Sequence, residues 1–273
     1  MSPRRARPSR SASRRDVIAA VDVGNSNITI GIFSGDRLAC SARAITRRRT
    51  TDEWEVLLQT LLSSRKISLS AVTGSAVASV VPDVTDNIRR ALLRHHSFVL
   101  DLNDPVVRAF VRVDYIPPVS VGADRIANAA AAHRLYPRKK NKIVVDFGTA
   151  TTFDCVAADG GYLGGVIYPG VEISAQSLFE KTAQLPKIDF SPVRSAIGKD
   201  TRSSIRSGLF YGSVGAVREI LKEIEKELGP SIRIGTGGLA PVVCPAVGGF
   251  HAIDADLTLK GVKMLFDKFR ASR

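Results

Sequence analysis

Asp22-Val23-Gly24-Asn25-Ser26-Asn27 and Asp146-Phe147-Gly148-Thr149-Ala150-Thr151 share the pattern D-x-G-[NT]-x-[NT]. Each follows an apolar run typical of a buried strand and precedes an alternating run, so the Asp ends a strand and the Gly opens a tight turn. Because D-x-G alone is common turn chemistry, the repetition is the informative feature. It predicts two related halves that begin alike.

The chemistry of the two turns suits a nucleotide. Backbone N–H groups, joined by the Ser and Thr hydroxyls, can wrap a polyphosphate tail. The two Asp carboxylates can hold the cation that accompanies the phosphates. Two unrelated hairpins are the alternative, but the shared Asp, Gly and hydroxyl or amide positions favour two half-sites that grip one nucleotide.

Size and charge exclude several classes of protein. A chain of 273 residues, 44% hydrophobic, can bury a sizeable core. Its apolar runs are shorter than the roughly 20 residues of a membrane helix, so no membrane association is expected. Residues 1–15 hold six arginines and no acid, which is +6 of the +13 net charge. We expect a disordered basic tail there, and nucleic-acid binding is unlikely except through it.

Cysteine and histidine usage gives no sign of a metal or disulfide framework. Cys40, Cys155 and Cys244 are far apart and lack metal-ligand spacing. Cys40 and Cys155 lie in strand-like runs, where we expect buried thiols that act as small hydrophobes, and a reducing cytoplasm is the expected location. None of the four histidines joins a metal-spaced cluster, so no chemistry is assigned to them.

Strands alternate with helices, which predicts an α/β fold. Thr50 and Glu53 have the spacing of a capping box before a helix. In the long helix expected over 200–228, Gly208, Gly212 and Gly215 imply a close approach by backbone or ligand. Strands are expected at 27–33, 37–45, 71–77, 98–100, 151–156 and 162–167, and further helices from Pro82 and from Val121 to His133.

A proline-containing connection ending at Pro118 divides the chain. We predict an N-terminal domain at 16–118 with the first phosphate loop. A C-terminal domain at 119–273 carries the candidate substrate and cation residues.

Several ordered motifs together make the chain, from about Asp16 to Lys268, resemble the type III pantothenate kinases. This family belongs to the actin-like superfamily of acetate and sugar kinases, Hsp70 and actin. The motifs are D-x-G-N-[ST]-N (22–27), T-x-D-E-W (50–54), S-V-V-P (79–82), V-G-A-D-R (121–125), D-x-G-T-A-T-T (146–152), G-G-x-I-x-P-G (164–170), G-K-x-T (198–201), S-G-x-x-x-G (207–212) and T-G-G-L-A (236–240).

The resemblance implies a duplicated two-domain fold with ribonuclease H-like halves. It implies ATP-dependent phosphorylation of pantothenate to 4'-phosphopantothenate, the first step of coenzyme A biosynthesis. Mg²⁺ and a monovalent cation, K⁺ or NH₄⁺, are the implied cofactors beside ATP, and a homodimer is the implied assembly.

The resemblance also implies roles for particular residues. Asp124 is the implied general base, Asp22 helps to hold Mg²⁺ through the phosphates, and Asp146 binds the monovalent cation. The implied ATP-binding residues are Asp22, Val23, Gly24, Asn25, Ser26, Asn27, Ile28, Thr29 and Thr149. The implied substrate-binding residues are Tyr115, Gly122, Ala123, Asp124, Arg125 and Thr201.

Physical chemistry agrees with this division of roles. An alcohol is a poor nucleophile, so a carboxylate beside it assists phosphoryl transfer. An arginine can hold the pantothenate carboxylate through two parallel hydrogen bonds. Ser120 departs from the family pattern, which often has Glu at that position.

Two other functions remain open from the sequence. One is an actin-like kinase that acts on a different small alcohol. The other is a transcriptional accessory protein of the same family, since the basic tail could touch nucleic acid.

Overall fold

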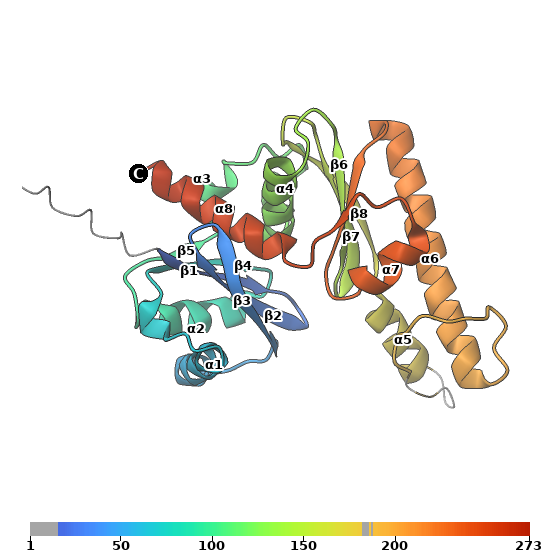
Figure 1. Cartoon of the computed structure of the whole chain (residues 1–273), viewed down its shortest axis with the longest axis horizontal. Coiled ribbons are helices and arrows are strands. Elements are labelled where there is room, and N and C mark those ends of the chain that lie inside the picture. The colour runs from blue at the N-terminus through green and yellow to red at the C-terminus, as the bar shows by residue number, and fades with distance from the viewer. Residues whose placement is uncertain (1–15, 182–185, 187) are drawn as a thin grey trace, which may run out of the picture.

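The computed structural model describes residues 16–181, 186 and 188–273; the expected basic tail, residues 1–15, lies outside them. The described chain contains two five-stranded sheets, with strand orders β3-β2-β1-β4-β5 and β8-β7-β6-β9-β10 (Figure 1). The two orders correspond strand for strand, because each sheet joins an antiparallel three-strand meander to two parallel strands. The predicted duplicated α/β fold is confirmed.

The first sheet follows the expected hairpin pattern. Helices α1 (Thr51–Ser63) and α2 (Pro82–Leu93) pack against one face of it, with Trp54 fully buried between them and the sheet. Its strands are β1 (Val17–Val23), β2 (Asn27–Ser34), β3 (Arg37–Ile45), β4 (Gly74–Ser79) and β5 (Val99–Asp101).

The second sheet repeats this plan. Helices α6 (Thr201–Leu228) and α7 (Ala240–Val247) cover one face of it, and α5 (Val171–Glu180) follows its edge strand. Its strands are β6 (Lys142–Phe147), β7 (Ala150–Val156), β8 (Tyr162–Pro169), β9 (Ile232–Thr236) and β10 (Ala252–Ile253).

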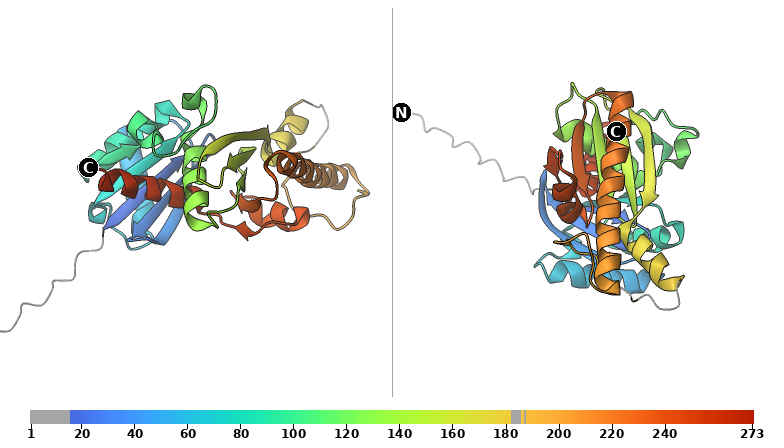
Figure 2. Two further views of the ribbon diagram at one scale, coloured as in Figure 1. Left: turned by 90° about the horizontal axis from the view of Figure 1, so that it is seen from above. Right: turned by 90° about the vertical axis from the view of Figure 1, so that its right-hand side faces the viewer.

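Two helices, α4 (Ala123–Leu135) and α8 (Leu257–Ala271), lie between the sheets. Ile126 and Ala127 of α4 pack with the first sheet, whereas Ala131 and Ala132 pack with the second. From above, α8 runs across the strands of the first sheet beside α4 (Figure 2). The C-terminal helix therefore returns to the first half of the chain, and a domain boundary at 118 stays a prediction.

The remaining elements are short. They are α3 (Pro105–Arg108) and the 3-10 turns η1 (Leu69–Ala71) and η2 (Pro118–Ser120). No helix in the described part of the chain is both long and apolar enough to cross a bilayer.

Two local expectations differ from the structure. The strand expected at 71–77 begins at Gly74, because residues 69–71 form η1. The expected close approach at Gly208, Gly212 and Gly215 is absent among the described residues, since no atom lies within 4 Å of an added Cβ there. These three glycines of α6 are exposed.

The capping box of α1 gives a stability prediction. The Thr50 side chain accepts from the Glu53 N–H, and Glu53 accepts from the Thr50 N–H. Thr50→Ala should lower the free energy of unfolding by about 1 kcal/mol, measured by urea denaturation. Thr60→Ala is the matched control, because this exposed mid-helix hydroxyl bonds only the Val56 carbonyl and Ala is the better helix former. Equal losses in both variants would contradict the capping role.

Candidate active site

A cleft of about 510 Å³ is lined by residues from both halves of the chain. Asp22 and Asp146, at the ends of β1 and β6, both lie on its wall. The Thr149 hydroxyl of the second D-x-G turn donates to the Ser26 hydroxyl of the first at 2.8 Å. The two turns, far apart in the sequence, thus meet at the cleft.

A backbone hydrogen bond from the glycine N–H closes each turn, with its acceptor three residues on in the first turn and two residues on in the second. The Gly24 N–H donates to the Asn27 carbonyl at 3.0 Å, and the Gly148 N–H donates to the Ala150 carbonyl at 3.1 Å. A third turn, at Gly237 after β9, packs against the second. Gly237 has φ +87°, and a Cβ there would lie 2.4 Å from Asp146 Oδ1. Only glycine therefore fits beside this carboxylate.

Three aspartates line the cleft from different elements: Asp22 from β1, Asp146 from β6 and Asp124 from the first turn of α4. Burial raises the pKa of all three, most of all that of Asp22, and the Asp124 charge raises the pKa of the other two further. The Asp146 pKa rises to about 7. The cluster therefore calls for positive charge from a ligand or cation when it is ionised.

Arg125 is fixed by a buried ion pair. Its Nε donates to Asp154 Oδ1 at 2.6 Å, and the Asp154 side chain is fully buried. The Tyr162 hydroxyl also donates to this carboxylate, at 3.3 Å. Burial raises the Asp154 pKa to about 6, while Arg125 opposes the rise. Arg125 Nη2 is buried and has no hydrogen-bond partner among the described residues, so it is free to donate a hydrogen bond to an anionic ligand.

Asn128 links this ion pair to the Asp146 carboxylate. Its Nδ2 lies 3.5 Å from both Asp146 Oδ2 and Asp154 Oδ2. Its Oδ1 accepts from the Thr258 hydroxyl of α8 at 2.8 Å. The amide donates to both carboxylates, which keeps them apart and fixes their direction.

The donors at the cleft suit hard cations and phosphates. Carboxylate oxygens and hydroxyls are typical ligands of Mg²⁺. Across the described residues, no three His, Cys, Asp or Glu side chains form a ready-made metal site. This arrangement fits a magnesium ion that takes several of its oxygen ligands from a bound polyphosphate.

The structure brings most of the predicted site residues together, but not all. Val23, Ile28 and Ala123 have side chains in the core. Tyr115 packs edge-on against Tyr162, with ring centroids 6.3 Å apart, and Thr201 begins α6 away from the cleft lining. The predicted residues on the cleft wall are Asp22, Gly24, Asn25, Asn27, Thr29, Gly122, Asp124, Arg125, Asp146 and Thr149.

Several polar residues on or behind the cleft wall were not predicted as site residues from the sequence. Asn128 follows Asp124 by one helical turn, so helical spacing could have found it. Asp154 is a charge inside an otherwise apolar strand, which is also a usable signal. Arg43, Glu172 and Thr258 also line the cleft, but nothing in their local sequence marks them.

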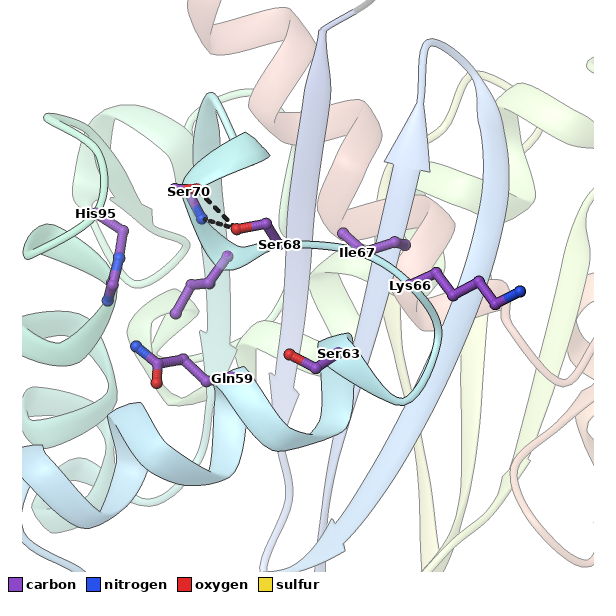
Figure 3. A pocket seen from close by; sticks show the side chains of 8 residues that line it. Gln59, Ser63, Lys66, Ile67, Ser68, Ser70 and His95 are labelled. Atoms are coloured by element: carbon purple, nitrogen blue, oxygen red, sulfur yellow. Dashed lines mark hydrogen bonds between the residues drawn. The ribbon is translucent and has the colours of Figure 1, made fainter.

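A second hollow, of about 460 Å³, lies beyond the end of α1 (Figure 3). None of the predicted site residues or carboxylates lines it. His95 is paired with Glu55, and the Ser68 and Ser70 hydroxyls hydrogen-bond each other. Lys66 points away from the other side chains in Figure 3. The hollow therefore has no converging chemistry.

A family profile and individual relatives assign the chain to the same family. Residues 18–223 match the profile described as "Type III pantothenate kinase". A type III pantothenate kinase of Myxococcus xanthus is 39% identical over 258 residues, which cover 94% of this chain and 100% of that protein. One from Agathobacter rectalis is 36% identical and covers 92% of this chain and 97% of that protein.

Comparison with solved structures supports the fold. MreB 5 of Spiroplasma citri, solved bound to AMPPNP, superposes with a TM-score of 0.55 at 10% identity. The match covers 94% of this chain and 98% of that chain. At this identity the likeness concerns the fold alone, which is that of the actin-like ATPases.

The raised Asp146 pKa predicts a pH effect on stability. The unfolded carboxyl ionises near pH 4, whereas the folded one keeps its proton to about pH 7. The cation-free protein should therefore lose stability as the pH rises from about 4 to about 7, where the folded carboxyl still holds a proton that the unfolded one has lost. The Asp146→Asn variant should lose less of its free energy of unfolding than the wild type between the two ends of this pH range. Urea denaturation in a choline buffer measures the loss.

Asp36→Asn, in the exposed turn between β2 and β3, is the control and should behave as the wild type. An Asp146→Asn variant with the full wild-type pH dependence would contradict this account of the carboxylate.

Proposed function

Because the chain belongs to the type III pantothenate kinase family, we propose that it performs its reaction in the cleft where the two D-x-G turns meet. The enzyme uses ATP to phosphorylate pantothenate, which commits that molecule to coenzyme A biosynthesis. The observation that carries the placement is the Ser26–Thr149 hydrogen bond, since it joins the two half-sites beside the carboxylates.

ATP would lie along the first turn. Backbone N–H groups of residues 22–29 would face the phosphates, with the polar side chains of this stretch, and Thr149 would contact them from the other half. Asn25, Asn27 and Thr29 on the cleft wall support this assignment.

Asp124 is the proposed general base. It opens α4 on the cleft wall, and its Oδ1 accepts from the Arg125 N–H at 2.8 Å, which fixes the carboxylate direction. A Cβ at Gly122 would lie 2.3 Å from Asp124 Oδ1. Gly122 therefore leaves room for the carboxylate at the helix start, where it takes the proton from the pantothenate alcohol as the phosphoryl group arrives.

Arg125 is the proposed partner of the pantothenate carboxylate. Asp154 fixes its Nε side, which leaves the unpartnered Nη2 for the substrate. Gly122, Ala123 and Tyr115 would shape the same end of the site around the substrate.

Asp22 would hold Mg²⁺ together with the phosphates, and Asp146 would hold K⁺ or NH₄⁺. Bound there, the cations neutralise phosphate charge that would otherwise oppose both binding and transfer. The oxygen donors and raised pKa values of both carboxylates support this assignment.

We also propose a homodimer formed through the outer side of α6. Gly208, Gly212 and Gly215 leave this side open to a second backbone, and Tyr211 and Ile197 beside it are 44% and 72% exposed. Close helix packing would offset the helix propensity that these glycines cost. Thr201, at the start of the same helix, would then reach substrate near the interface.

A cytoplasmic location is the remaining part of the proposal. Cys40, Cys155 and Cys244 are free thiols. A reducing compartment keeps thiols in that state.

Replacement of the general base gives a direct test of function. Asp124→Asn should lower kcat by roughly 10²- to 10⁴-fold in a coupled assay with ATP, K⁺ and pantothenate. Asp83→Asn, which removes an exposed carboxylate paired with Arg48, should keep full activity. Equal turnover by the wild type and Asp124→Asn would reject the proposed base.

The dimer surface can be tested separately. Gly212→Leu should shift the protein from dimer to monomer in sedimentation velocity and lower pantothenate phosphorylation, because a bulky side chain separates the two α6 helices. Arg89→Leu is the control: it places the same side chain at an exposed position of α2, and this variant should stay dimeric. A Gly212→Leu protein that remains dimeric would contradict this interface.

A further inference from the structure

Positive charge is scarce on the wall of the active-site cleft. The carboxylates lining it are Asp22, Asp124, Asp146 and Glu172, whereas the only cationic side chains lining it from the described residues are Arg43 and Arg125. A triphosphate adds several more negative charges to this site. The two arginines are therefore the side chains on this wall that can bind anionic groups of the ligands.

Arg125 is committed to another partner. Its Nε holds the buried Asp154 carboxylate at 2.6 Å, and its backbone lies beside the proposed base on α4. Its unpartnered Nη2 is already assigned to the substrate carboxylate in the proposed function. The phosphate end of the cleft then depends on Arg43 or on metal ions alone.

Arg43 makes no hydrogen bond or ion pair with any other described side chain or carbonyl. It comes from β3 and is paired in register with Thr29, in the strand that follows the first D-x-G turn. Its guanidinium lies close enough to the carboxylates to lower the pKa values of Asp22 and Asp146. A free cation beside the first turn is thus available for an anionic ligand.

The same guanidinium also approaches the second half of the molecule. Its Nη1 lies 3.1 Å from the position of a Cβ on Gly238, in the glycine turn that follows β9. That turn packs against Asp146 through Gly237. Arg43 therefore spans the cleft mouth from the first sheet to the second.

We propose that Arg43 binds the phosphate chain of ATP, with its guanidinium placed between the first D-x-G turn and the Gly237-Gly238 turn. A planar guanidinium can donate two parallel hydrogen bonds to phosphate oxygens. With one face on the nucleotide and one edge at Gly238, it ties both halves to the same ligand. The inference rests on the proposed function, because it assigns a residue of that ATP site.

Calorimetric titration of ATP and of adenosine into the wild type and three variants tests the inference. Arg43→Gln should weaken ATP binding by about 10- to 100-fold, the effect of losing hydrogen bonds to a charged group. The ATP affinity of Arg43→Lys should lie between those of the wild type and Arg43→Gln, because lysine keeps the charge but loses the paired hydrogen bonds. Adenosine binding should be unchanged, and in steady-state assays KM should rise for ATP but not for pantothenate.

Arg37→Gln is the matched control, since Arg37 is an exposed arginine at the far end of the same strand. It should bind ATP as the wild type does. Unchanged ATP affinity in Arg43→Gln, or an equal loss for adenosine, would overturn the role of Arg43 alone. A wild type that binds no ATP would instead overturn the proposed function.

Discussion

The packing of α4 against α8 is the contact on which the rest of the molecule depends. A Cβ on Gly261 of α8 would lie 1.9 Å from the Ala127 carbonyl of α4, so the two helices approach as closely as backbones allow. This approach lets Thr258 bond Asn128 at 2.8 Å. Because α4 packs against both sheets, it also carries Asp124 and Arg125 to the line where the two D-x-G turns meet. The last helix of the chain thus completes a site that its first strand begins.

The site gathers like charges that folding alone would keep apart. Buried carboxylates are costly unless they are paired or neutralised. Among the four aspartates at the site, Asp154 is the one that has a cation, Arg125, in direct contact within the described part of the chain. Asp22, Asp124 and Asp146 lie in the cleft with raised pKa values, and their cost is offset when a cation or a donor reaches them. The clustered carboxylates therefore favour the binding of positively charged groups in the cleft.

The sequence predicts the fold well where local patterns decide it. The D-x-G repeat indicates two matching hairpins, and Thr50 with Glu53 indicates a helix start; both are present. It does less well where distant segments meet. Arg43 and Thr258 reach the cleft through sheet register and helix packing, which no short window of sequence contains. The glycines of α6 show the same limit, because their cost in helix propensity suggests a close neighbour, and no atom of the described residues lies within 4 Å of a Cβ added there.

The two D-x-G turns have the same pattern but different surroundings, and this difference supports different tasks. Asp146 is held by the Asn128 amide and backed by the Asp154–Arg125 pair, so its carboxylate has a fixed direction. Asp22 has no side-chain hydrogen bond from the described residues. A fixed carboxylate suits an ion that stays with the enzyme, whereas an untethered one can follow a metal that arrives and leaves with the nucleotide. Duplication supplied two equivalent acids, and the residues packed around α4 made them unequal.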